Sequence, residues 1–250
     1  MTSFPLTHLE VCIDNIESLH AAQQGGATRI ELCSSLSLGG LTPSLGFMRQ
    51  AARTAKIPVY AMIRPRQGDF LFSDEDLEIM LADIHAAKQA GLQGVVIGVL
   101  TRDGQIDTVQ LSALMQAAQG LGVTFHRAID QCADYHEALD ILMSAGCERV
   151  LTSGLKASAL EGADTLADMV RYCGNRLSIM AGAGVTADNA AQILSRTGVR
   201  ELHLSGKHTR PSQMMHVASE AHMGSQDVDD FAIPVTSSEK IAAVLRALRS

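Results

Sequence analysis

Strand-like and helix-like segments alternate along this 250-residue chain, and the alternation constrains its fold more than any other feature. The β-prone segments lie near residues 8–13, 29–33, 58–64, 94–99, 122–127, 149–153, 177–182 and 200–205. Helical patterns of about ten residues or more follow them, near 15–24, 44–55, 74–90, 107–119, 134–145, 164–173, 187–196 and 238–249. Crossovers of this size place consecutive strands parallel. The sequence therefore predicts an α/β protein whose residues 1–250 form a single (β/α)8 TIM barrel, with an open doubly wound sheet as the structural alternative.

One stretch breaks the alternation. The period is lost over about residues 208–236, which we expect to form a long irregular loop after the eighth strand. The soft or nitrogen-bearing side chains of this loop are Met214, Met215, His216, His222 and Met223. Loops of this length in compact domains are usually functional or disordered, and this one would emerge from the face of the barrel that carries the active site.

Composition excludes several classes of partner. The formal net charge is −7, whereas nucleic acid or an anionic membrane surface would attract a basic face. No apolar run approaches the roughly 20 residues that cross a bilayer, so we expect a cytoplasmic protein with no nucleic-acid or membrane partner. The cysteines number five and form no Cys-x-x-Cys pair, which favours free thiols in a reducing compartment.

Polar side chains gather at the ends of the expected strands. Residues 122–130 are the clearest case, because a β-prone segment there ends in an imidazole, a guanidinium and a carboxylate. In a TIM barrel the active site lies at the C-terminal ends of the strands, so such groups converge on one face. If Glu10, Arg64, His126 and His203 share the inward parity of their strands, the upper layer of the barrel interior is charged.

Three arginines indicate a site for an anion. Arg64 and Arg66, with Arg127 across the barrel mouth, would form a cationic concavity, and guanidinium groups bind carboxylate or phosphate through two hydrogen bonds. The alternative is structural: Arg64 could instead pair internally with Glu10 or Glu31.

Small residues follow the seventh and eighth expected strands, where barrel enzymes commonly bind phosphate through backbone N–H groups. Gly182 and Gly184 follow the seventh strand, and Ser205 and Gly206 follow the eighth. We expect these four residues to contribute to the anion site. Tight turns between strand and helix are the alternative reason for glycine there.

An acid–base pair is a further candidate. His126 and Asp130 could be a catalytic imidazole and its partner, with Glu10 or Glu31 as the second titrating group. A single histidine on a strand is otherwise often a hydrogen-bonded core residue.

Cys12 and Cys33 end adjacent strands, so their thiols could lie close together and hold a metal. Soft thiolates and thioethers select Cu(I), and the methionines and histidines of the 208–236 loop could supply further ligands. Packing is the competing explanation, since cysteine is often buried and methionine often fills gaps in a core.

Taken together, the motifs resemble the CutC family. The matching residues are 31–33, 39–44, 62–66, 68–70, 125–128, Asp130, 151–154 and 181–185, in order along roughly residues 8–206. The resemblance implies a (β/α)8 barrel, a cytoplasmic homodimer and a role in copper homeostasis through Cu(I) binding or trafficking. It also places Cys12 and Cys33 at the positions of the candidate copper ligands. The 208–236 loop lies outside these motifs.

Two functional hypotheses follow. The first is a copper homeostasis protein whose cofactor or cargo is Cu(I). The second is a TIM-barrel enzyme, of undefined reaction, that acts on a small phosphorylated or carboxylated metabolite by acid–base chemistry.

Overall fold

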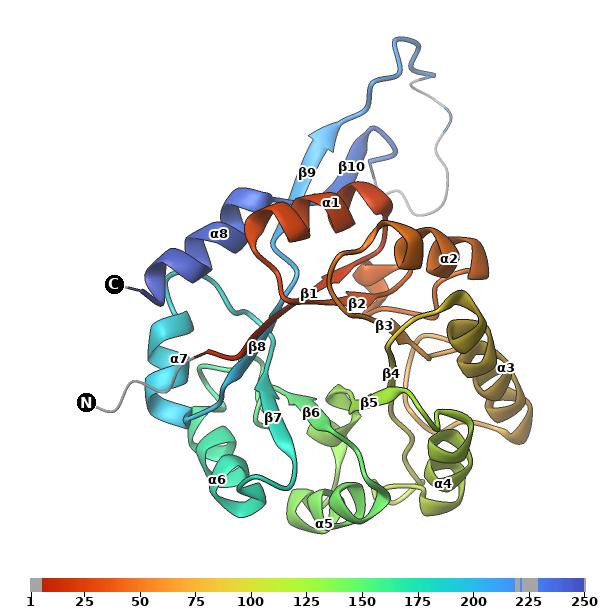
Figure 1. Cartoon of the computed structure of the whole chain (residues 1–250), viewed down its shortest axis with the longest axis vertical. Helices are drawn as coiled ribbons and strands as arrows, with labels where there is room; N and C mark the ends of the chain where they lie inside the picture. The colour runs from red at the N-terminus through yellow and green to blue at the C-terminus, as the bar shows by residue number, and fades with distance from the viewer. Residues whose placement is uncertain (1–5, 219–220, 222–228, 250) are drawn as a thin grey trace.

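The computed structural model describes residues 6–218, 221 and 229–249, and it contains a closed barrel of eight parallel strands surrounded by helices (Figure 1). The strands are β1 (His8–Ile13), β2 (Arg29–Leu32), β3 (Val59–Met62), β4 (Gly94–Ile97), β5 (Gly122–Phe125), β6 (Arg149–Thr152), β7 (Ser178–Ala181) and β8 (Glu201–Leu204). Each pairs with its neighbour in sequence, and β1 pairs with β8 to close the ring. The predicted (β/α)8 TIM barrel is confirmed, and the open sheet is excluded.

Eight α-helices among the described residues form the outer layer. They are α1 (Ile16–Gly25), α2 (Leu45–Thr54), α3 (Asp74–Ala90), α4 (Thr108–Ala117), α5 (Tyr135–Ala145), α6 (Ala163–Cys173), α7 (Ala190–Thr197) and α8 (Ser238–Ala247). Two short 3₁₀ turns, η1 (Leu36–Leu38) and η2 (Arg127–Gln131), follow β2 and β5 at the C-terminal face. No helix in the described ranges has the length and apolar character needed to cross a membrane.

Local sequence accounts for the helix ends, as α3 shows. The Ser73 hydroxyl accepts a hydrogen bond from the Asp76 backbone N–H, and the Asp76 carboxylate accepts one from the Ser73 N–H. This reciprocal cap satisfies two of the backbone donors that a helix start leaves open. The helix ends at Gly91, whose positive φ of 83° suits a residue without a β-carbon.

Alternation along the strands separates two apolar regions. Outward side chains such as Leu9, Val11 and Ile13 are fully buried between the barrel and its helices. A second, much smaller apolar cluster consists of Cys33, Tyr60, Met62 and Val96. The remaining space inside the barrel is largely polar, so the barrel interior depends on charge pairing more than on hydrophobic contact.

Tyr60 fills the N-terminal end of the barrel interior. A β-carbon on Gly94 would overlap the Tyr60 ring, and one on Gly122 would overlap its hydroxyl. Both glycines therefore serve close packing, because only hydrogen at these positions leaves room for the ring.

The prediction of an irregular loop over 208–236 is wrong at both ends of that range, where the chain forms strands. β9 (Lys207–Pro211) and β10 (Ala232–Thr236) pair as an antiparallel ribbon that projects from the barrel (Figure 1). The Arg210 guanidinium also pairs with the Glu17 carboxylate of α1, at 2.8 Å. The two strands lie about twenty residues apart in sequence, so their pairing leaves no local periodic signal.

The two described methionines of this segment do not reach the barrel interior. Met214 is 66% exposed and Met215 is fully exposed. His216 is also exposed, whereas His222 and Met223 lie outside the described residues. The described structure therefore provides no methionine or histidine ligand from this segment beside Cys12.

We predict that Gly94→Ala lowers the free energy of unfolding by about 1–3 kcal/mol, because the added methyl group overlaps the Tyr60 ring. Chemical denaturation followed by circular dichroism measures the change. Gly46→Ala is the matched control on α2, where the nearest atom to the new β-carbon is 3.9 Å away, and it should be neutral or stabilising. Equal effects of the two substitutions would contradict the packing role of Gly94.

Candidate functional site

The barrel mouth brings together three side chains that could hold a metal ion: Cys12, Glu31 and His203, called here the mouth cluster. One potential ligand atom from each lies within 4.8 Å of the others. Strand register explains the meeting, because Cys12 of β1 stands opposite Glu31 of β2, and His203 of β8 stands opposite the neighbouring Glu10. Three adjacent strands thus place their inward side chains in one small volume.

Two carboxylates hold the His203 ring. Its Nδ1 lies 2.8 Å from Glu10 Oε1, and its Nε2 lies 3.8 Å from Glu31 Oε2. Burial alone would lower the pKa of His203, but Cys12, Glu31 and Glu10 together raise it well above its usual value of 6.5. The ring is therefore an imidazolium near neutral pH, and a metal ion that used its nitrogen would have to displace a proton.

Glu31 is the carboxylate of the mouth cluster. Burial raises its pKa, and its Oε1 is buried without a hydrogen-bond partner in the described part of the chain. Its Oε2 accepts a hydrogen bond from Cys33 Sγ at 3.5 Å, and burial followed by the proximity of Glu31 raises the pKa of the Cys33 thiol well above 9.0. An open acceptor in such a position fits a cation, since unpaired buried polar atoms are costly.

Glu10 is held as a carboxylate and is unsuited to proton transfer near neutral pH. Burial opposes its charge, yet hydrogen bonds and charge from His203 and Arg29 lower its pKa to about 2. Of the two glutamates predicted as a second titrating group, Glu31 is the one with a raised pKa.

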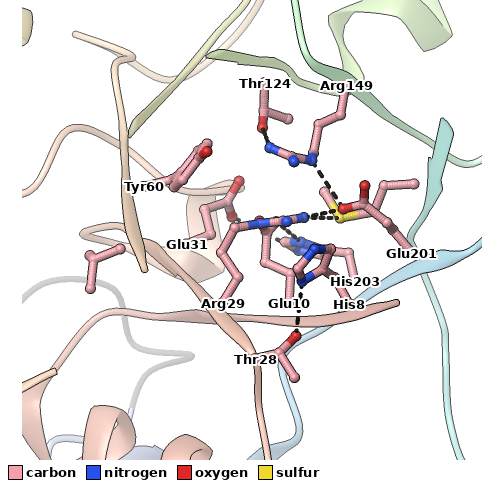
Figure 2. Close-up of polar contacts among 12 residues, drawn as sticks. His8, Glu10, Thr28, Arg29, Glu31, Tyr60, Thr124, Arg149, Glu201 and His203 are labelled. Atoms are coloured by element: carbon pink, nitrogen blue, oxygen red, sulfur yellow. Dashed lines mark hydrogen bonds and ion pairs between the residues drawn. The ribbon is translucent and has the colours of Figure 1, made fainter. Parts of the chain in front are cut away.

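Beneath the mouth cluster lies an ion network that the sequence analysis missed (Figure 2). Arg29 Nε bonds Glu10, and its Nη2 bonds Glu201 Oε2 at 2.5 Å. Arg149 Nε bonds the same Glu201 oxygen at 3.0 Å. Both guanidinium groups lie over the Tyr60 ring, at 5.6 and 5.3 Å from its centre. The sequence signal for this network was charged residues at alternate positions within strands that are buried on both faces. That signal does not show which charges pair.

The predicted His126–Asp130 pair does not form a hydrogen bond. His126 Nδ1 accepts from the Ala128 backbone N–H at 3.1 Å, and burial lowers the pKa of the ring to about 3. Asp130 instead accepts hydrogen bonds from the Thr152 hydroxyl at 2.5 Å and the Ser153 hydroxyl at 2.9 Å. The turn η2 begins directly after His126 and directs Asp130 toward β6, a feature that spacing alone did not indicate. His126 Nε2 remains buried without a partner among the described residues.

Arg64 and Arg66 connect loops. The two terminal nitrogens of Arg64 donate to the carbonyl oxygens of Leu38, Gly40 and Gly68, at 3.1, 3.3 and 2.7 Å. Backbone carbonyls therefore take these donors, and the alternative partners Glu10 and Glu31 do not. Arg66 pairs with Asp69 at 2.9 Å and Asp76 at 3.4 Å, both on the segment that follows it. Arg64 therefore joins the loops after β2 and β3, and Arg66 stabilises the loop after β3.

A cavity of about 650 Å³, called here the mouth cavity, opens above the mouth cluster. Its wall includes Cys12 and His203 together with most of the residues predicted for an anion: Arg127, Gly184, Ser205 and Gly206. Among the predicted glycines, Gly182 is the exception. Its N–H donates to the Thr152 carbonyl at 3.0 Å, and a β-carbon there would lie 2.6 Å from Leu151 Cδ1, so its role is packing.

All five cysteines are free thiols, as the sequence predicts. Cys132, Cys147 and Cys173 are buried, and they fall outside the mouth cluster. Cys33 contacts the cluster through Glu31.

Comparison with known proteins identifies close relatives. The model of the CutC family matches residues 7–208. The CutC family protein of Photobacterium profundum is 73% identical over 241 residues, which cover 96% of this chain and 98% of the relative. That of Vibrio campbellii is 62% identical over 244 residues, covering 97% and 99%.

Solved structures agree. The CutC protein of Streptococcus agalactiae, named for copper homeostasis, is 36% identical and superposes with a TM-score of 0.76, covering 79% of this chain and 98% of that one. A thiamine phosphate pyrophosphorylase from Pyrococcus furiosus, 16% identical with a TM-score of 0.58 and covering 98% and 97%, shares the fold alone.

We predict that Arg29→Met destabilises the protein by about 3–5 kcal/mol, because it leaves Glu10 without its guanidinium and Glu201 with Arg149 alone. Arg53→Met on the exposed side of α2 is the control and should change stability by less than about 0.5 kcal/mol. The unfolding midpoint in denaturant measures both. A mild effect of Arg29→Met would mean that the network does not hold the barrel interior together.

Proposed function

This chain belongs to the CutC family, and on that premise we propose that it binds Cu(I) in the barrel mouth as part of copper homeostasis. The observation that carries the proposal is the mouth cluster, in which a thiol, a carboxylate and an imidazole lie within 4.8 Å of one another. The cluster borders a cavity, which gives an ion a path to it.

The donor atoms fit a soft or borderline transition metal. Thiolate favours Cu(I), and imidazole is accepted by copper as well. Cys33 lies 3.5 Å from Glu31 through its sulfur, so a small rotation of either side chain could bring a second thiolate to the ion. Glu31 Oε1, which has no partner in the described structure, is available to an ion without breaking an existing contact.

Outer residues support the proposed ligands. Glu10 accepts from Nδ1 of His203 and leaves Nε2 facing the cluster, which is the arrangement by which carboxylates orient metal-binding histidines. Arg29 in turn fixes Glu10. Glu10 and Arg29, which lie beneath the mouth cluster, thus orient the proposed ligand His203 before an ion binds.

A reducing compartment such as the cytoplasm suits this chemistry, because Cu(I) and unpaired thiols are both stable there. We include that location in the proposal, supported by the five free cysteines. The homodimer implied by the family resemblance stays a prediction.

We predict that Cys12→Ser weakens Cu(I) binding by more than roughly 100-fold, beyond what loss of an outer-shell contact costs. Cys33→Ser should weaken it by a smaller factor, because Cys33 reaches the cluster through Glu31. Competition with a chromophoric Cu(I) chelator under anaerobic, reducing conditions gives the dissociation constants.

Cys173→Ser is the matched control, since this buried cysteine of α6 lies outside the cluster. It should bind Cu(I) as the wild type does. Unchanged affinity in a Cys12→Ser, Cys33→Ser double variant would reject the proposed site.

We predict that Cu(I) affinity rises with pH. The pKa values of His203, Glu31 and the Cys33 thiol are all raised, so protons compete with the metal for these ligand atoms more strongly than they would in water. Calorimetry in buffers of different ionisation enthalpy counts the protons released on binding. Binding without net proton release near pH 7 would contradict this ligand set.

A further inference from the structure

We propose that the mouth cavity also binds the phosphate group of a small phosphate monoester, seated on the backbone amides of residues 183–185 between Arg127 and Lys207. This inference goes beyond copper binding and stands on different atoms. Cys12 and His203 of the mouth cluster line the cavity together with residues of the loops after β7 and β8.

Backbone donors in the loop after β7 are open. The carbonyl of Ala183 accepts from the Ala159 N–H at 3.0 Å, and that of Gly184 accepts from Asn189 Nδ2 at 2.8 Å. Since the N–H of a trans peptide points opposite to its carbonyl, the N–H groups of Gly184 and Val185 point away from these partners. Within residues 6–218, 221 and 229–249, no acceptor bonds the N–H of Ala183, Gly184 or Val185.

The backbone of the loop after β7 is strained. Ala183 has a φ of 76° and Gly184 a φ of 72°. A positive φ is unfavourable for alanine, which places the loop among the strained segments that often border binding sites. All three residues of this loop line the mouth cavity.

Charge in the cavity favours an anion. Besides His203, its lining includes three cationic side chains, Arg127, Lys207 and Lys240, and one carboxylate, Asp188, so positive charge is in excess. Arg127 is oriented by Asp130 at its Nε and by Ser153 at its Nη2, which leaves Nη1 to a ligand. Lys240 Nζ donates to the Lys207 carbonyl at 2.5 Å, while no acceptor in the described ranges takes Lys207 Nζ.

A phosphate monoester matches these donors better than a carboxylate does. Its three terminal oxygens can take the three open amides and the two cationic groups at once, whereas a carboxylate has two oxygens. The cavity, at about 650 Å³, is far larger than a phosphate group, so the rest of the molecule would extend toward Cys12 and His203. The structure thus assigns a small phosphorylated metabolite as ligand class.

Calorimetric titration of the metal-free protein with glycerol 3-phosphate, and separately with inorganic phosphate, tests the assignment. Both should bind, and glycerol at the same ionic strength should not. Lys207→Gln should weaken binding about tenfold, because it removes a charged donor without breaking a described side-chain contact. Lys56→Gln, which makes the same charge change at an exposed site between α2 and β3, should leave binding unchanged.

Arg127→Gln provides a second variant, with its fold checked by circular dichroism because Asp130 loses a partner. Absence of binding in the wild type, or equal weakening by Lys207→Gln and Lys56→Gln, overturns the proposal. Vesicles containing phosphatidic acid test a lipid headgroup, and binding to them without binding to glycerol 3-phosphate also overturns it. Because copper is absent throughout, these outcomes are independent of the proposed Cu(I) site.

Discussion

The pairing of buried charges inside the barrel is the constraint on which the site depends. Glu10, Arg29, Arg149 and Glu201 are all nearly or fully buried, and each one alone would be costly to remove from water. Together they neutralise one another across β1, β2, β6 and β8. Glu10 then has one oxygen left for His203, and this contact sets the direction of the imidazole. The chemistry of the mouth is therefore prepared by groups that a ligand would never touch.

The described geometry gives the mouth two chemically different sets of groups. Thiol, carboxylate and imidazole stand on β1, β2 and β8. The open amides stand on the loop after β7, and the cationic groups are Arg127 after β5, Lys207 after β8 and Lys240 of α8. A soft cation and an oxyanion suit these two sets respectively. The two hypotheses that the sequence left open thus concern neighbouring surfaces of one cavity, and either could be tested without reference to the other.

The barrel itself was predictable, because eight alternating β and α patterns with crossovers of similar length leave few other topologies. Inward parity also correctly grouped Glu10 with His203. The hydrogen-bond partners of the site residues were not predictable. Asp130 lies four residues after His126, yet a 3₁₀ turn directs it to Thr152 and Ser153, and only the path of the backbone decides that. Arg64 was similarly indistinguishable from an anion ligand until the carbonyls around it were located.

The position of Tyr60 determines how a bound species can enter and leave the barrel. Its ring fills the space over Gly94 and Gly122, and Arg29 and Arg149 lie against it, each of the three at most 8% exposed. These three side chains close the N-terminal end of the barrel interior, so the described barrel has no passage through it. If an ion binds at Cys12 as proposed, it would have to leave by the opening through which it came, and its donor and its acceptor would have to dock on the same rim, one after the other.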